Sequence, residues 1–186
     1  LNFVDIDGDG DLDAFLGMGH YSGSGGIIFF RNIGTASNPA FYRDSLNPFG
    51  LGSMGIYLSP EFVDIDDDGD IDSFIGSEHG SMFFENTSMA SIPYFGGGMA
   101  FGSSNVMGGY NRAPVFVDID GDGDLDAFVG KQNYYGESDG TIFFENTGTA
   151  NRPISAAPVL NPFGLSDTGG YAIFTLVDID NDDDLD

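Results

Sequence analysis

The stretch VDIDGDGDLD, residues 4–13, decides how the whole chain is interpreted. It places five aspartates within the nine positions from Asp5 to Asp13. Like charges this close repel one another, so a folded chain needs something that offsets the repulsion. A hydrophobic strand or an amphipathic helix does not require this pattern. The stretch therefore indicates a loop that is built around a counter-charge.

The same pattern occurs four times, at starting positions 59, 54 and 60 residues apart. We call these segments acidic loops 1 to 4 and number their positions from 1 to 9: DIDGDGDLD at 5–13, DIDDDGDID at 64–72, DIDGDGDLD at 118–126 and DIDNDDDLD at 178–186. They contain five, six, five and six of the 30 acidic residues in the chain. An acidic coat that serves solubility would be spread evenly, whereas this charge is concentrated at four points.

Other segments repeat in register with the acidic loops, which is the mark of a repeat architecture. Each of the first three loops is followed by a short apolar run, and then by GIIFFRN, GSMFFEN or GTIFFEN. LNPFGL occurs at 46–51 and again at 160–165. The predicted units are 1–59, 60–113 and 114–173, with 174–186 as the start of a fourth. Because the sequence opens and ends at acidic loops, we expect it to be part of a longer protein.

The sequence predicts an all-β fold. Short segments rich in Phe, Val and Ile are separated by Gly, Asn and Pro, and no stretch keeps a helical apolar period. Each unit has room for about four strands: one before the acidic loop, one after it, one at IFFEN, and one near or just after NPFGL. The continuous apolar runs favour strands buried on both faces. We therefore expect repeated four-stranded antiparallel sheets of the β-propeller blade type, in a closed ring or an open stack.

The acidic loops offer only oxygen ligands, and this favours Ca²⁺ over Zn²⁺ or Cu²⁺. Side-chain oxygens stand at positions 1, 3, 5 and 9, while glycine at position 6 permits a sharp turn that aims the position 7 carbonyl inward. Mg²⁺ fits less well because it retains its waters. The loops are not EF-hands, because position 12 is Leu16, Ile75 or Val129 where that loop has a bidentate glutamate.

We expect about one Ca²⁺ for each repeat. The fourth loop is the weakest match, because Asp183 replaces glycine at position 6. The predicted metal ligands are Asp5, Asp7, Asp9, Asp11 and Asp13; Asp64, Asp66, Asp68, Asp70 and Asp72; Asp118, Asp120, Asp122, Asp124 and Asp126; and Asp178, Asp180, Asp182, Asp184 and Asp186.

These residues resemble the FG-GAP and VCBS-type repeats, and the wording FVDIDGDGDLDAFVG, GTIFFENTGTA and NPFGL within 116–165 is very similar to the bacterial form. The resemblance covers nearly the whole chain. It implies calcium-bearing blades of an integrin-α-like propeller, found in large secreted bacterial surface proteins. It also implies that the aspartates at positions 1, 3, 5 and 9 are the calcium ligands.

Composition narrows the partners and the chemistry. The net charge is −25, with only five Lys and Arg, so nucleic acid is excluded as a partner and anionic membranes are disfavoured. The chain has no membrane-spanning apolar run and no cysteine, so membrane insertion and thiol chemistry are not expected. We expect no enzymatic activity, because every dense carboxylate cluster is assigned to an ion.

Three roles remain open. The first is a calcium-stabilised extracellular module for adhesion or interaction, secreted or at the cell surface, with an unidentified protein or carbohydrate ligand. The second is a segment of an extracellular structural fibre, in which the repeats associate with one another. The third is a non-catalytic accessory domain of a secreted enzyme.

Overall fold

A computed structural model of the chain describes residues 1–19, 25–52, 54–88, 92–100, 110–111, 114–132, 140–165 and 176. The fold is all-β, as predicted, and it consists of three antiparallel sheets. The first sheet contains β1 (Asn2–Val4), β2 (Asp13–Gly17), β3 (Ile27–Asn32) and β4 (Phe41–Leu46) in that order. The second contains β5 (Ser59–Val63), β6 (Asp72–Ser77), β7 (Gly80–Phe84) and β8 (Met99–Ala100). The third contains β10 (Val115–Val117), β11 (Asp126–Gln132), β12 (Gly140–Phe144) and β13 (Val159–Leu160), with β9 (Tyr110–Asn111) also paired to β11.

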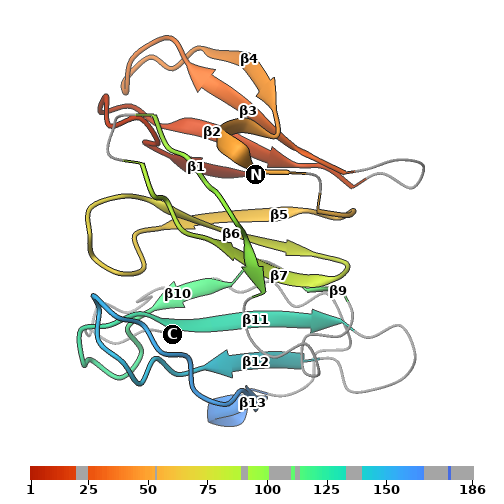
Figure 1. Ribbon diagram of the computed structural model, residues 1–186, viewed down its shortest axis with the longest axis vertical. Coiled ribbons are helices and arrows are strands. Elements are labelled where there is room, and N and C mark those ends of the chain that lie inside the picture. The colour runs from red at the N-terminus through yellow and green to blue at the C-terminus, as the bar shows by residue number, and fades with distance from the viewer. Residues whose placement is uncertain are drawn as a thin grey trace.

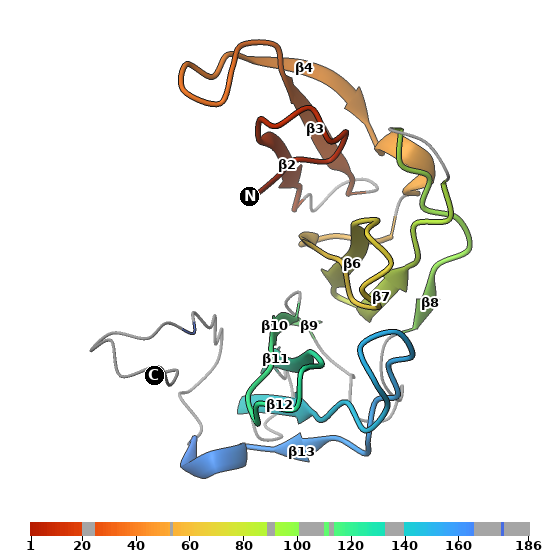
Figure 2. The same cartoon turned by 90° about the vertical axis from the view of Figure 1, so that its left-hand side faces the viewer.

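The sheets follow one another along the long axis of the molecule (Figure 1). Turned by 90°, they form an arc in which β4, β8 and β13 lie on the outer side (Figure 2). This is the arrangement of propeller blades, and over the described residues the arc does not close into a ring. The only helical segments that the structure describes, η1 (Pro48–Gly50) and η2 (Pro162–Gly164), are far too short to cross a membrane.

Acidic loops 1, 2 and 3 are the connections of hairpins. Each joins the first strand of its sheet to the second, and the aspartate at position 9 begins the second strand. That aspartate stands opposite the valine that precedes position 1, as in the pair Val4 and Asp13. The three loops lie on the same side of the molecule, at the left in Figure 1 and toward the viewer in Figure 2. Each described acidic loop therefore has the same position in its sheet, between the first and second strands.

The fourth strand lies near NPFGL, as predicted, but it precedes the motif: β4 ends at Leu46 and β13 at Leu160. The alternative of a strand just after NPFGL is wrong, because the LNPFGL segments form turns that follow the strand. In the first unit, Asn47 and Phe49 have φ of 53° and 55°, which lie in the left-handed region that no strand uses. The Asn47 side chain accepts a hydrogen bond of 2.9 Å from the backbone N–H of Ile27 at the start of β3. Asn161 and Thr141 form the equivalent bond in the third unit, at 3.0 Å. The motif therefore clamps the end of the fourth strand to the third.

The sheets pack through one repeated phenylalanine contact. Phe15 on β2 lies 4.3 Å from Phe62 on β5, and Phe74 on β6 lies 4.4 Å from Phe116 on β10, measured between ring centroids. In both pairs, the phenylalanine two residues after position 9 meets the one two residues before position 1 of the next loop. Aromatic pairs of this kind contribute about 0.5–1.5 kcal/mol beyond the burial of their area. The repeat in the sequence therefore becomes a repeat in the core.

The inner strand β6 of the second sheet is buried along its whole length, whereas the first sheet has an exposed face. Ile75 on β6 is fully buried against the first sheet, whereas Leu16, its equivalent on β2, is 37% exposed. Phe3 on β1 is 50% exposed, whereas Phe62, at the same repeat position, is 8% exposed. The face of the first sheet that points away from the second is therefore an open apolar surface within the described part of the chain. We call it the outer face of sheet 1 and define it by Phe3, Leu16 and Phe41.

Candidate metal sites

Three groups of carboxylates converge at the acidic loops. Each consists of the aspartates at positions 1, 3 and 5, whose ligand atoms all lie within 4.8 Å of one another. The triads are Asp5, Asp7 and Asp9 in loop 1, Asp64, Asp66 and Asp68 in loop 2, and Asp118, Asp120 and Asp122 in loop 3. The predicted ligands at these positions are thus brought together in every loop that the structure describes.

The aspartate at position 1 holds each loop in shape. Both carboxylate oxygens of Asp5 accept backbone hydrogen bonds, one from the N–H of Asp9 at 3.1 Å and one from Gly10 at 2.9 Å. The corresponding bonds to Asp64 measure 3.1 and 3.0 Å, and Asp118 accepts bonds of 2.8 to 3.1 Å. Gly10 has φ of 90°, which confirms the sharp turn predicted at position 6.

Position 4 makes a second left-handed turn that the sequence analysis missed. Gly8 and Gly121 have φ of 72° and 77° there, whereas loop 2 has Asp67 with φ of 54°. This region costs a residue with a Cβ more than glycine, although aspartate tolerates it better than most. The signal was present in the sequence, because loops 1 and 3 share a glycine at this position. Loop 2 therefore carries backbone strain as well as an additional charge.

The aspartate at position 9 lies beside the triad and is buried. Oδ1 of Asp13 accepts a bond of 2.7 Å from the backbone N–H of Asn32, and its Oδ2 is buried with no partner in the described part of the chain. Asp72 and Asp126 accept the same bond from Asn86 and Asn146, each at 2.7 Å. A buried carboxylate oxygen without a donor is costly unless a cation approaches it.

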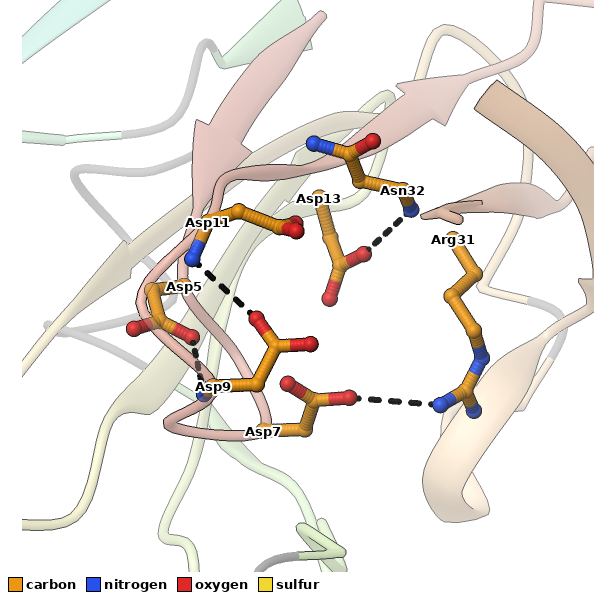
Figure 3. Close-up of polar contacts among 7 residues, drawn as sticks. All are labelled: Asp5, Asp7, Asp9, Asp11, Asp13, Arg31 and Asn32. Carbon is orange, nitrogen blue, oxygen red and sulfur yellow. Dashed lines mark hydrogen bonds and ion pairs between the residues drawn. The ribbon is translucent and has the colours of Figure 1, made fainter. Parts of the chain in front are cut away.

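The side chains at position 7 of loops 1 and 3 also turn into their loops. Figure 3 shows the Asp11 carboxylate beside that of Asp13 within loop 1. Its Oδ1 is buried without a hydrogen-bond partner in the described structure, as are Asp7 Oδ1 and Asp124 Oδ1. The turn at position 6 predicts that position 7 contributes its backbone carbonyl. The structure adds that its carboxylate lies close enough to the loop centre to share the same electrostatic environment.

Burial raises the pKa values of the position 9 carboxyls. The pKa of Asp72 is raised to about 7, first by burial and then by the neighbouring Asp66 and Asp68, against the opposing hydrogen bonds from Asn86 and Ile65. Burial likewise raises the pKa of Asp13 to about 6. A raised pKa means that the ionised carboxylate is disfavoured, because neither solvent nor a nearby cation offsets its negative charge. A bound dication supplies that compensation.

The asparagine of each FFRN or FFEN segment connects the site to the next turn. The Asn32 side-chain oxygen accepts bonds from the N–H groups of Gly34 and Ala40, at 3.0 and 2.9 Å. Asn146 does the same for Gly148 and Ile154, at 3.0 and 2.8 Å. The same asparagine thus donates its backbone N–H to the position 9 aspartate and orders the turn after the third strand with its side chain.

Arg31 gives loop 1 a neighbour that the sequence analysis did not identify. Its Nη1 lies 3.2 Å from Oδ2 of Asp7, the aspartate at position 3 (Figure 3). Among the side chains that the structure describes, no Lys or Arg pairs with loop 2 or loop 3. The arginine lies in FFRN, where the other two units have FFEN. Comparison of the repeats could therefore have identified it as the residue that distinguishes the first unit.

The fourth loop lies outside the described residues. The predicted ligands there are Asp178, Asp180, Asp182, Asp184 and Asp186. For the three described loops, the donor set is entirely carboxylate and backbone oxygen, and in loops 1 and 3 carboxylate oxygens are buried without donors in the described structure. This set fits Ca²⁺, which takes six to eight oxygen ligands in a flexible shell. No protein-family model matches the chain, and the search of curated proteins found no match either.

Proposed function

We propose that the chain is a calcium-binding, calcium-stabilised repeat module of the FG-GAP or VCBS type that acts in adhesion or interaction outside the cell. The observation that carries the proposal is the threefold recurrence of one arrangement: a carboxylate triad next to a buried position 9 aspartate. In an acidic chain, a single cluster of this kind has little weight. Three equivalent clusters, each in the loop between the first two strands of its sheet, support a common ion-binding role.

In this proposal, the ion is structural. The carboxylates at positions 1, 3 and 5 hold it, with positions 7 and 9 beside them. Bound Ca²⁺ supplies positive charge that removes the mutual repulsion within each loop. Each loop then fixes the first hairpin of its sheet, and the bond that the Asn32 N–H donates to Asp13 extends the effect to the third strand. The carboxylates have no catalytic task, because they are committed to the ion.

Thermal unfolding tests the calcium role. We expect millimolar Ca²⁺ to raise Tm by at least about 10 °C over the chelated protein, since each site occupied at 100 times its Kd contributes ~2.7 kcal/mol. Mg²⁺ at the same concentration should give a much smaller shift. The exposed Asp44 on β4 offers a matched control: Asp44→Asn removes one carboxylate outside the loops and should preserve the response. An unchanged Tm on chelation would contradict the proposal.

A second role, self-association into a fibre, is favoured by the outer face of sheet 1. Phe3 occupies the repeat position at which Phe62 and Phe116 pack against a preceding sheet. Its ring lies 5.8 Å from that of Phe41, and both are exposed. The face thus has the same residue type as the two internal interfaces, so a unit of the same kind fits it. Head-to-tail contacts that do not close generate filaments.

Sedimentation in calcium tests this second role. The chain should form particles larger than a monomer at micromolar concentration, and Phe3→Glu should return them to monomers. Tyr42→Glu, at an exposed position of β4 outside the defined face, is the matched control. A chain that remains monomeric up to ~1 mM, where an association with Kd in the same range would show, would exclude self-association as its role.

A further inference from the structure

The three described sites differ in charge at the residue that follows the two phenylalanines of the third strand. The residue after the two phenylalanines is Arg31 in the first unit, and Glu85 and Glu145 in the second and third. A change from glutamate to arginine alters the local charge by two units beside a site proposed to bind a dication. Loops 1 and 3 are identical in sequence, so between these two sites this position is where the electrostatics diverge; loop 2 also differs by the charge of Asp67.

Arg31 occupies one oxygen of a proposed ligand. Its guanidinium pairs with Asp7 Oδ2 at 3.2 Å. It also lies over the Phe29 ring, 5.7 Å from the ring centroid, in a cation–π contact that helps to hold it in place. Asp7 Oδ1 is buried and has no partner in the described structure. Arg31, Asp7 and Asp9 also line one cavity of about 290 Å³. The arginine therefore shares both a carboxylate and a cavity with the triad.

Loop 1 nevertheless retains the features of an ion site. The side chain of Asp13 is only 2% exposed, and its Oδ2 lacks a hydrogen-bond partner in the described part of the chain. Figure 3 shows this carboxylate directed into the loop, on the side of Asp13 away from the bond to Asn32. Arg31 pairs with Asp7 and does not donate a hydrogen bond to this oxygen. One guanidinium thus offsets part of the loop charge without replacing a cation at its centre.

The residue after the two phenylalanines has the same place beside each loop. It directly precedes the asparagine whose backbone N–H donates to the position 9 aspartate, a bond of 2.7 Å in all three described loops. This residue is arginine beside loop 1 and glutamate beside loops 2 and 3, so it brings a charge of opposite sign to the same part of the site.

We propose that Arg31 makes loop 1 the weakest of the three described calcium sites and the one that least requires calcium to keep its shape. This inference rests on the proposed calcium binding and deepens it. The guanidinium repels an incoming dication and competes with it for Asp7, whereas Glu85 and Glu145 attract it. With rising calcium, loops 2 and 3 fill first and loop 1 fills last. Without calcium, Arg31 partly neutralises loop 1, while loops 2 and 3 stay under full repulsion.

Calcium titration followed by ¹H–¹⁵N correlation spectra resolves the three sites. Gly10, Gly69 and Gly123 each donate an N–H to the position 1 aspartate of their own loop, so their amide signals report occupancy separately. We expect half-saturation of the Gly10 signal to need about tenfold more Ca²⁺ than that of the other two, the size that one nearby charge difference gives at a partly exposed site.

Charge exchange identifies the cause. Arg31→Glu should bring the Gly10 midpoint to within about threefold of the others, and Glu85→Arg should raise the Gly69 midpoint about tenfold. Arg43→Glu makes the same charge change at an exposed position of β4 and should leave all three midpoints unchanged. Equal midpoints in the unaltered chain, or an Arg31→Glu variant whose Gly10 midpoint does not move, would overturn the inference. If no glycine responds to Ca²⁺ at all, the proposed calcium function itself fails, which is a different result.

Discussion

The carboxylate of Asp13 accepts a hydrogen bond of 2.7 Å from the backbone N–H of Asn32, which ends β3. The two residues are 19 positions apart, and the bond joins the proposed ion site to the third strand of its sheet. Asp72 with Asn86 and Asp126 with Asn146 repeat it at the same length. Each position 9 aspartate therefore has one oxygen committed to the third strand. The second oxygen faces the loop, where that of Asp13 has no partner in the described structure and those of Asp72 and Asp126 accept longer bonds of 3.5 and 3.4 Å from backbone N–H groups.

Replacement of Asp13 by asparagine should have opposite effects with and without calcium. Asparagine keeps the oxygen that accepts from Asn32 and removes a buried charge, so Asp13→Asn should raise the Tm of the chelated protein at pH 8 by about 3–5 °C. In saturating calcium, the variant lacks a negative charge at the ion and should melt below the unaltered chain. Calorimetry under both conditions checks the reversal. A variant that melts lower in both would show that the Asp13 charge does not oppose folding.

The chelated chain should become less stable as the pH rises from about 4 to about 7. Burial raises the pKa of folded Asp72 to about 7 and that of Asp13 to about 6, both above the ordinary value of 3.8. The folded chain therefore binds more protons than the unfolded chain in this window, and its stability falls as those protons leave. The stability from these groups is complete below about pH 4, and its loss ends above pH 7.

Thermal melts in a chelating buffer between pH 4.5 and 8 measure this dependence. Asp72→Asn should flatten the slope between pH 6 and 7, because that carboxyl no longer titrates there. A chelated chain whose Tm rises steadily from pH 5 to 8 would show that other carboxyls control its stability.

Asp67→Gly should stabilise the chain. Asp67 has φ of 54° at position 4 of loop 2, where loops 1 and 3 have Gly8 and Gly121. Glycine enters this region without a Cβ penalty, and the change also removes one charge from the repelling cluster. We expect a gain of about 0.5–1 kcal/mol in the free energy of unfolding of the chelated protein. Denaturant unfolding checks the gain, and Asp67→Ala serves as the control, because it removes the charge but keeps the Cβ.

Phe62→Ala should cost far more stability than Phe3→Ala, although both phenylalanines occupy the same repeat position. Phe62 packs on Phe15 at 4.3 Å between ring centroids, and its removal leaves a cavity between the first two sheets. The expected loss is about 3–5 kcal/mol, against less than about 1 kcal/mol for the half-exposed Phe3. Denaturant unfolding of monomeric protein measures both. Comparable losses would show that the outer face of sheet 1 is covered in solution.

The sequence by itself determined the features whose partners lie close along the chain. The repeat is visible in the sequence directly. The strands on either side of each acidic loop, and the convergence of positions 1, 3 and 5, depend only on residues of a single hairpin. The turn that glycine permits brings residues such as Asp5 and Asp9 close together. The NPFGL segment was the exception, because the alternation of strand and turn residues does not reveal that Asn47 and Phe49 adopt left-handed backbone angles.

Only the tertiary structure decided the features that depend on distant partners. Burial of Asp13, which raises its pKa, needs the end of β3, and the pairing of Asp7 with Arg31 crosses 24 residues. Leu16 and Ile75 occupy the same position in the repeat, yet only Ile75 is covered by a neighbouring sheet in the described structure. Periodicity specifies which face of a strand is apolar. What packs on that face, and which charges lie next to an ion site, is fixed by the arrangement of sheets in space.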